Sequence, residues 1–484
     1  MRNLKVIRTN VKIEPDASRV LIRPFIPHKD RVVKIIARIA AQPDREVSEH
    51  LQKIRKDFSA RHIEVESTFL SRYDSIRDLQ FTDLEPSLER RLLIGSYFTS
   101  EYSLESAALF NPSIVPHPDQ SNLEEGSTRF IMSLRAVGEG HVSSVAFREG
   151  VIDEKNSIKL VKPTRFVVTP NPVINKQFDK KVMAQKFMDM GFSNEYSDKV
   201  FHLLSDEFTF ADLDETIREL HAREPALSHA HHRTKENLFW IAKANYDIQF
   251  DTDVPIGGRI LFPNAPSEKQ GIEDARFVRF TSRHGEVRYY ATTTAWDGKT
   301  MLTQIIETND FLTFKVRTLN GEAVRNKGMA LFPRKIGGKY AMLSRLDNEN
   351  IYLMYSDYVQ FWRNSQLLMK PSYPWEFYQM GNCGSPLETE EGWLVITHGV
   401  GAMRRYAIGA ALLDLEAPGI VRGRTTSPIL VPNQNEREGY VPNVVYSCGG
   451  QVHGDHLIVP YAMSDYASRF AIVSLERLLG LLTD

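Results

Sequence analysis

The chain has 484 residues, and its 60 lysines and arginines nearly balance its 61 aspartates and glutamates, giving a formal net charge of −1 at pH 7. With almost no net charge, the protein has no overall electrostatic attraction for nucleic acid or for an anionic membrane. A substrate must therefore be recognised by the residues of a local site. The N-terminal residues lack an apolar signal core and no segment is apolar enough to span a membrane, so we expect an unexported, cytoplasmic protein.

The first hundred residues are predicted to form a largely helical extension. After an extended opening that ends at Pro24 and Pro27, residues 28–97 carry apolar and charged side chains at helical spacing. We assign residues 1–100 to this extension and residues 101–484 to a catalytic domain. The amphipathic pattern suggests that the extension caps that domain or takes part in a homo-oligomer.

A second helical stretch is predicted inside the domain. Residues 176–225 include DKKVMAQKFMDMGF and DLDETIRELHARE, which have the periodicity of amphipathic helices and a candidate capping residue in Asp212. The stretch separates the first strands from a regular alternation of strands and turns that begins at about Asn237. We therefore interpret it as an insertion in an otherwise β-rich domain.

A repeat runs through the β-rich part of the chain. Five short apolar strands each lead from a bulky residue to a polar one at the same offset: Phe130 to Arg135, Tyr289 to Thr294, Tyr340 to Arg345, Trp393 to His398 and His456 to Tyr461. Copies of this kind, about fifty residues apart in the later part, are typical of radially repeated sheets. The fold class is therefore predicted to be mainly β, a five-bladed β-propeller. The polar residue at the end of each repeated segment would then lie near the propeller axis.

One strand carries a candidate acid. In GIEDARFVRF, Glu273 and Asp274 are adjacent, and on extended backbone they would point to opposite faces, so we expect only one to address the axis. A structural carboxylate pair is the alternative. A carboxylate in the pocket would balance the positive charge of Arg135, Arg345 and His398, which favours the first interpretation.

Neither a metal nor a nucleotide cofactor is indicated. His229, His231 and His232 lie in a polar linker without cysteine or carboxylate ligands at zinc spacing. The sequence has no glycine-rich phosphate loop of the Walker or dinucleotide kind. The two cysteines, Cys383 and Cys448, are too few for a disulfide framework and are expected to be reduced thiols.

Several long motifs resemble one known family. ILFPNAPSEKQGIEDARFVRF, ALFPRKIGGKYAMLSR, GNCGSPLETEEGWLVITHGVGAMRRYAIGAALLDLEAP and REGYVPNVVYSCGG resemble glycoside hydrolase family 130, which contains β-mannoside phosphorylases and β-1,2-mannosidases built as five-bladed propellers. The resemblance covers roughly residues 105 to 480 and leaves out the N-terminal helices. It implies an exo-acting, inverting enzyme for β-linked mannosides that needs no metal or organic cofactor.

The resemblance also implies roles for single residues. Asp274 corresponds to the catalytic acid that protonates the glycosidic oxygen. Asn111, Arg135 and Asp465 correspond to mannose-binding positions of the family, and we predict from the sequence itself that Glu273 and Tyr461 also bind the sugar. The residues predicted to bind phosphate are Lys327, Arg345 and His398.

Two reactions remain open on these residues. Phosphate held by basic residues can attack the anomeric carbon itself, whereas a hydrolase needs a carboxylate that activates water, and Glu388, Glu390 and Glu391 in SPLETEEGW are candidates. Because Arg345 and His398 are retained, we predict an inverting phosphorylase of β-1,2-manno-oligosaccharides that releases mannose 1-phosphate. The alternatives are an inverting exo-β-1,2-mannosidase and a carbohydrate-binding propeller without catalytic activity.

Overall fold

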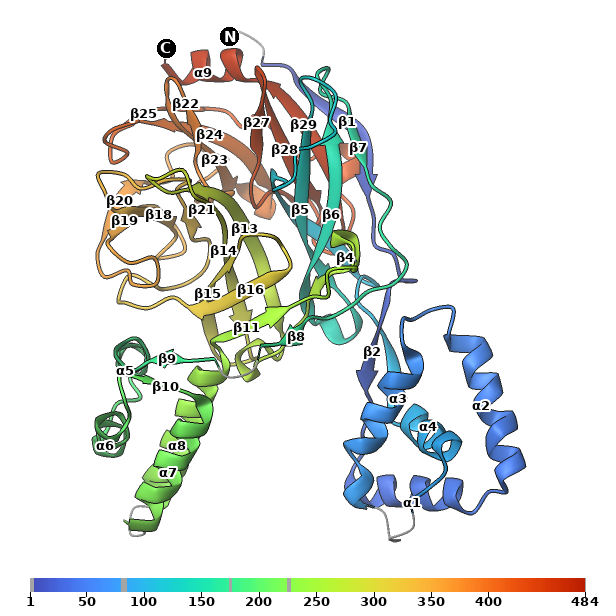
Figure 1. Cartoon of the computed structure of the whole chain (residues 1–484). Coiled ribbons are helices and arrows are strands. Elements are labelled where there is room, and N and C mark those ends of the chain that lie inside the picture. The colour runs from blue at the N-terminus through green and yellow to red at the C-terminus, as the bar shows by residue number, and fades with distance from the viewer. Residues whose placement is uncertain (1–3, 80–84, 174–175, 224–227, 484) are drawn as a thin grey trace.

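The computed structural model describes residues 4–79, 85–173, 176–223 and 228–483. This part of the chain is mainly β, with helices near the N-terminus, in the middle of the chain and at the C-terminus (Figure 1). Within these residues, no helix is both long and apolar enough to cross a membrane. Cys383 and Cys448 are not paired in a disulfide, and both are buried.

The N-terminal helices predicted for residues 28–97 are present. They lie between two paired strands, and the elements are β2 (Val20–Pro24), α1 (Lys29–Ala40), α2 (Asp44–Phe58), α3 (Val65–Asp74), α4 (Leu88–Tyr97) and β3 (Thr99–Ser103). Their apolar faces share a small core that includes Val32, Val47 and Leu93. In Figure 1 these helices stand apart from the large strands, to which β2 and β3 connect them.

The remaining strands form five antiparallel groups in chain order. The first group is β4 (Ala108–Pro116), β5 (Thr128–Val137), β6 (Ser143–Ile152) and β7 (Ile158–Leu160). The second is β13 (Gly271–Thr281), β14 (Val287–Trp296), β15 (Met301–Thr308) and β16 (Thr313–Thr318). The third is β17 (Ala330–Leu331), β18 (Tyr340–Ser344), β19 (Ile351–Ser356) and β20 (Ser365–Met369).

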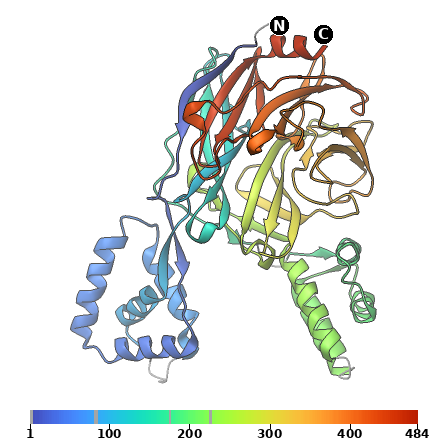
Figure 2. The same cartoon turned by 180° about the vertical axis from the view of Figure 1, so that it is seen from behind.

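The last two groups complete the series. The fourth is β21 (Gln379–Asn382), β23 (Gly392–Val400), β24 (Tyr406–Leu413) and β25 (Val421–Arg424), with β22 (Leu387–Thr389) beside β23. The fifth is β26 (Val445–Tyr446), β28 (His456–Met463) and β29 (Ala467–Ser474), with β27 (Gln451–His453) beside β28. Its outer strand is β1 (Val6–Ile13), from the other end of the chain, and α9 (Leu475–Thr483) follows β29 (Figure 2).

The five repeated segments occupy equivalent places in these groups. They lie on β5, β14, β18, β23 and β28, each of which pairs with the first strand of its group. Arg345 follows directly after the end of β18. The repeat in the sequence therefore corresponds to a repeat in the structure.

The helical insertion is longer than the sequence indicated. It contains β8 (Asn171–Pro172), β9 (Phe178–Asp179), α5 (Lys180–Asp189), α6 (Glu195–Leu203), β10 (Glu207–Phe208), α7 (Phe210–Arg223) and α8 (Ser228–Lys243), and β11 (Tyr246–Gln249) returns to β16. The segment that we took for a polar histidine linker is therefore helical from Ser228 onward. The reason is that Leu238, Ile241 and Ala242 of α8 pack into a core shared with α5, α6 and α7.

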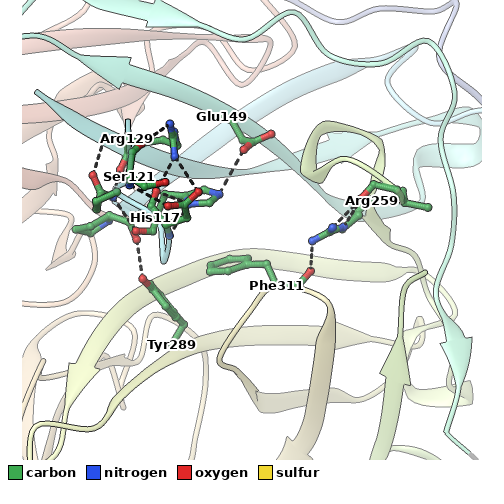
Figure 3. Close-up of polar contacts among 11 residues, drawn as sticks. His117, Ser121, Arg129, Glu149, Arg259, Tyr289 and Phe311 are labelled. Carbon is green, nitrogen blue, oxygen red and sulfur yellow. Dashed lines mark hydrogen bonds and ion pairs between the residues drawn. The ribbon is translucent and has the colours of Figure 1, made fainter. Parts of the chain in front are cut away.

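Side chains join the first and second groups across their junction (Figure 3). Tyr289 on β14 donates its hydroxyl to the carbonyl of Pro116 at the end of β4, at 2.8 Å. Arg259 lies next to β12 (Ile260–Leu261), which pairs with β6, and its Nη1 donates to the carbonyl of Phe311 at 2.8 Å. These bonds add to the parallel pairing of Ser143 on β6 with Gly271 on β13, which joins the two groups in one sheet.

Candidate active site

All five strand groups contribute to one cavity of about 180 Å³. Its walls are formed by polar and aromatic side chains, namely Phe110, Asn111, Arg135, Asp274, Lys327, Arg345, Arg404, Tyr406, Tyr440, Val444, Tyr446 and Asp465. Six of the nine residues predicted for the site thus line the cavity. The other three, Glu273, His398 and Tyr461, lie elsewhere and are described below.

Glu273 and Asp274 address the same arginine, against our expectation from strand alternation. Arg135 Nη2 donates to Glu273 Oε1 at 2.7 Å, and Arg135 Nη1 lies 3.6 Å from Asp274 Oδ1. The pairing of β13 with β14 shifts register between Glu273 and Arg276, and Asp274 has a φ of 53°. A bulge in the left-handed region breaks the alternation, so both carboxylates can turn toward one partner.

Left-handed backbone recurs at three more residues of the cavity, Asn111, Arg404 and Asp465. Asn111 and Asp465 each have a φ of 50°, and β4 also shifts register around Asn111. Asn111 Nδ2 donates to Asp274 Oδ1 at 2.7 Å, while its buried Oδ1 has no hydrogen-bond partner within the described chain. Strained backbone and unsatisfied buried acceptors both cluster at functional sites, so this side of the cavity is built for a ligand.

The two carboxylates of the cavity have opposite pKa shifts. Burial alone would raise the pKa of Asp274, but the charges of Arg135, Lys327 and Arg276 outweigh it and hold this pKa below its usual value. Burial and the negative charge of Asp274 raise the pKa of Asp465 to about 6. Near neutral pH, Asp274 is therefore ionised in the empty site, while Asp465 is close to its titration range.

Replacing Asp465 with asparagine is expected to stabilise the protein at neutral pH. The unfolded chain releases this proton near pH 3.8 and the folded chain near pH 6, so stability falls as pH rises through that window and stays lower above it. The shift corresponds to at most about 3 kcal/mol in the free energy of unfolding. Denaturant unfolding at pH 7.5 and pH 5 measures it, with the exposed Asp253→Asn as control. An Asp465→Asn protein less stable than wild type at pH 7.5 would contradict the assignment.

A hydrogen bond to His398 holds the guanidinium group of Arg345 in place. Arg345 Nη1 donates to His398 Nε2 at 3.0 Å, and Arg345 Nη2 donates to Asn348 Oδ1 at 2.9 Å. Burial, followed by the charges of Arg345 and Arg276, lowers the pKa of His398 well below its usual value, so the imidazole is a neutral acceptor. His398 thus positions Arg345, in contrast to its predicted place as a direct phosphate ligand.

Gly381 allows this arrangement to pack. A Cβ added at Gly381 would lie 2.5 Å from His398 Cε1 and 2.6 Å from Arg345 Cδ, both closer than real Cβ atoms approach. Only glycine leaves room for the two side chains to stack against the strand. Arg345 Nε remains buried without a hydrogen-bond partner among the described residues, which leaves a donor beside the cavity.

Sequence reasoning missed the contribution of Arg276 and Tyr446. Arg276 Nη2 donates to the Tyr446 hydroxyl at 2.6 Å, and Tyr446 lines the cavity. The two residues are 170 positions apart, so their contact has no local signal in the sequence. The loop residue Arg404, with a φ of 53°, also lines the cavity.

Other predicted residues take different places. Tyr461 is fully buried among apolar side chains of the fourth and fifth groups, and its hydroxyl donates to Glu436 Oε1 at 2.6 Å, so it does not line the cavity. Lys327 does, with Nζ at 4.0 Å from Glu273 Oε2. Glu388 lies on β22 and pairs with Arg334 at 2.7 Å on the surface. The cavity walls therefore contain none of the three glutamates considered as a base.

Comparison with known proteins gives a consistent family. The family model of glycoside hydrolase 130, described as β-1,4-mannooligosaccharide phosphorylase, matches residues 256–484. A 1,2-β-oligomannan phosphorylase of a Thermoanaerobacter species is 40% identical over 153 residues, which cover 31% of this chain and 51% of that protein. A β-1,2-mannobiose phosphorylase of Listeria innocua is 34% identical over 212 residues, 42% of this chain and 58% of that protein.

The chain thus spans little more than half of the length of these two relatives. A solved structure of β-1,2-mannobiose phosphorylase from Listeria innocua with β-1,2-mannobiose aligns with 78% of this chain and 92% of its own, at 21% identity and a TM-score of 0.46. A third relative, a β-1,2-mannobiose phosphorylase of a Thermoanaerobacter species, is 34% identical over 232 residues, which cover 45% of this chain and 72% of that protein. The extent of this match shows that the chain belongs to glycoside hydrolase family 130.

Proposed function

We propose that the protein is an inverting glycoside phosphorylase that cleaves β-linked mannosides, preferentially β-1,2-manno-oligosaccharides, and releases mannose 1-phosphate. The observation that carries this proposal is a single cavity whose walls contain Asp274 together with the basic residues Lys327, Arg345 and Arg404. Guanidinium and ammonium groups bind phosphate oxygens well. The names of the relatives, all mannoside phosphorylases, support the same reaction class.

In the proposed mechanism, the non-reducing mannose occupies the side of Asn111, Arg135 and Asp465. Asp274 gives a proton to the glycosidic oxygen, directly or through a sugar hydroxyl, and the bond from the anomeric carbon to that oxygen breaks. A phosphate oxygen held by Arg345 and Lys327 attacks the opposite face of the anomeric carbon, so the configuration inverts. Hydrogen phosphate brings one proton to the site, which replaces the proton that leaves with the released sugar.

The low pKa of Asp274 supports a requirement for phosphate. In the empty site, positive charge keeps this carboxylate ionised, and an ionised carboxylate cannot act as an acid. A bound phosphate dianion offsets the charges of Lys327 and Arg276, and the pKa of Asp274 then rises toward the working pH. Asp274 would thus be protonated only when phosphate is bound, which disfavours hydrolysis by water.

We also propose that the five strand groups are the blades of a five-bladed β-propeller. Each group has four antiparallel strands when β1 is counted with the fifth. The contribution of every group to one cavity supports a radial arrangement around it. In this proposal the helical insertion joins the first and second blades, phosphate is the co-substrate, and the site needs no metal or organic cofactor. A cytoplasmic location agrees with a reaction that consumes phosphate and yields a sugar phosphate.

Hydrolysis is the second candidate, because Asp465 is a further carboxylate in the same cavity. A mannosidase would use it to activate water. The pKa of about 6 lets Asp465 ionise at neutral pH, as a base requires. Glu388, which we had considered for this task, is engaged with Arg334 outside the cavity.

Product analysis separates these reactions. Purified protein is incubated with β-1,2-mannobiose, with and without inorganic phosphate, and the products are identified by nuclear magnetic resonance. We expect equimolar mannose and α-mannose 1-phosphate only when phosphate is present, because inversion converts a β-linkage into an α-phosphate. Equal release of mannose without phosphate would contradict phosphorolysis and support the mannosidase. No release from β-1,2- or β-1,4-mannobiose under either condition would contradict both and support a carbohydrate-binding protein.

A further inference from the structure

A second polar cavity of about 190 Å³ lies where the helical insertion meets the second strand group. Its walls include Lys176, Asp179 and Lys186 from the insertion and Arg317 and Thr318 at the end of β16. In Figure 1, β9 and α5 lie below β16 and β11, at the edge of the large strands. The insertion side of this cavity precedes residue 256, where the family model begins to match.

Lys176 brings an unsatisfied ammonium group to this cavity. Its Nζ is buried and has no hydrogen-bond partner among the described residues. The same Nζ lies 4.6 Å from the centre of the Phe178 ring, so the aromatic face is its nearest favourable contact. A buried ammonium without hydrogen-bond acceptors is unfavourable, and native proteins seldom keep one unless a ligand supplies the acceptors.

The other charged groups around the cavity, unlike Lys176, already have hydrogen-bond partners. Lys186 Nζ donates to the carbonyl of Leu319 at 2.6 Å, and Arg317 Nη1 donates to Asp247 Oδ1. Of the nearby carboxylates, Asp247 is therefore already paired, and Asp179 Oδ1 accepts the backbone N–H of Val182 at 3.0 Å as the cap of α5. The three basic side chains thus lie among three carboxylates, Asp179, Asp189 and Asp247, each of which already accepts a hydrogen bond from another group.

These surroundings affect the titration of the two lysines. Burial, reinforced by the charge of Arg317 and opposed by Asp247, lowers the pKa of Lys176 to about 6. Burial lowers the pKa of Lys186 to about 8, with Asp189 opposing it. At neutral pH Lys176 is mostly uncharged in the empty cavity, and a bound anion would draw a proton onto it.

We infer that this cavity is a second anion site, in which Lys176, Lys186 and Arg317 hold a phosphate group that is either free or carried by a small sugar. A phosphate oxygen supplies the acceptor that the Lys176 ammonium lacks. Lys186 lies on α5 and Arg317 on β16, so a bound anion would link the insertion to the strands. The site is separate from the cavity of Asp274 and stands whether or not the proposed reaction is correct.

Calorimetric titration of the full chain tests the inference, with sulfate as the probe because sulfate does not titrate near neutral pH. Arg345→Ala removes the main anion contact of the first cavity, and Lys176→Met is then added in the same protein. We expect sulfate to bind Arg345→Ala with proton uptake at pH 7.5, seen as a dependence on buffer ionisation enthalpy. In the double variant we expect binding at least about tenfold weaker and no proton uptake. Equal affinity and equal proton uptake in both proteins would overturn the inference.

Two controls keep the result interpretable. Lys181→Met removes a lysine from the exposed side of the same helix, and we expect it to leave sulfate binding unchanged. Lys176→Met is expected to melt no lower than wild type in anion-free buffer, because it removes a buried amine that has no hydrogen-bond partner among the described residues. A lower melting midpoint for Lys176→Met, with the same rise on adding sulfate in this variant and in wild type, would overturn the inference. Competition with phosphate and with mannose 1-phosphate then identifies the source. Stronger competition by the sugar phosphate assigns the site to it, and equal competition assigns it to free phosphate.

Discussion

Replacing Asp274 with asparagine is expected to lower the rate of β-1,2-mannobiose phosphorolysis by about a hundredfold to ten-thousandfold. Asparagine keeps the size of the side chain and can still bond Asn111, but it cannot release a proton to the glycosidic oxygen. The rate is measured as kcat with saturating phosphate. The matched control is Asp253→Asn, which removes an exposed carboxylate and should retain wild-type activity.

An aryl β-mannoside distinguishes an acid from a residue that merely shapes the cavity. A nitrophenolate leaves without protonation, so the loss in Asp274→Asn should shrink to tenfold or less with that substrate. A similar loss with both substrates would assign Asp274 a structural role. A variant that keeps more than a tenth of the wild-type rate on mannobiose would contradict the proposed acid.

Replacing Arg345 with methionine should lower kcat/KM for phosphate by about a hundredfold to a thousandfold. Methionine fills much of the same space, but it cannot donate to phosphate or balance its charge. Initial rates at varied phosphate and fixed mannobiose give this value. Binding of mannose, measured separately in the absence of phosphate, should change little, because Arg345 is one of the basic residues proposed to bind phosphate.

Arg334→Met is the matched control for that experiment. Arg334 is an arginine of the same strand group, but it pairs with Glu388 on the surface and does not line the cavity. We expect its kcat/KM for phosphate to equal that of wild type. An unchanged kcat/KM in Arg345→Met would exclude this arginine as a phosphate ligand, and an equal loss in Arg334→Met would point to a general effect of charge.

The repeat located the strands of the site but could not decide which marked residues reach the cavity. Arg135 and Arg345 do, whereas Tyr461 lies at the same offset and bonds Glu436 between apolar strands. A fixed offset gives position along a strand, but the length of each strand and its local twist decide where the side chain ends. Arg135 and Tyr461 each lie two residues before the end of their strands, so position along the strand alone does not decide which side chain reaches the cavity.

The bulges at Asn111 and Asp274 were beyond prediction for a different reason. Alternation along a strand assumes uninterrupted pairing, and an extra residue changes the face of every side chain near it. Asparagine and aspartate tolerate left-handed backbone better than most residues, which is the only local hint. The sequence analysis took the start of α8 for a linker because its first residues are polar and charged. The apolar residues of α8 that pack into the core lie further along the helix.

The pairing of β1 with β29 has consequences for folding during synthesis and for the design of truncated variants. Val6 pairs with Val473, so the outer strand of the fifth group is synthesised at the beginning and its partner close to the end. Contacts this distant in sequence slow folding, and until synthesis is complete β1 lacks its neighbour. A deletion that removes the N-terminal helices together with β1 would uncover the edge of β29, which invites strand exchange with another copy. Variants that remove the helices should therefore retain residues 4–13 and rejoin the chain after them.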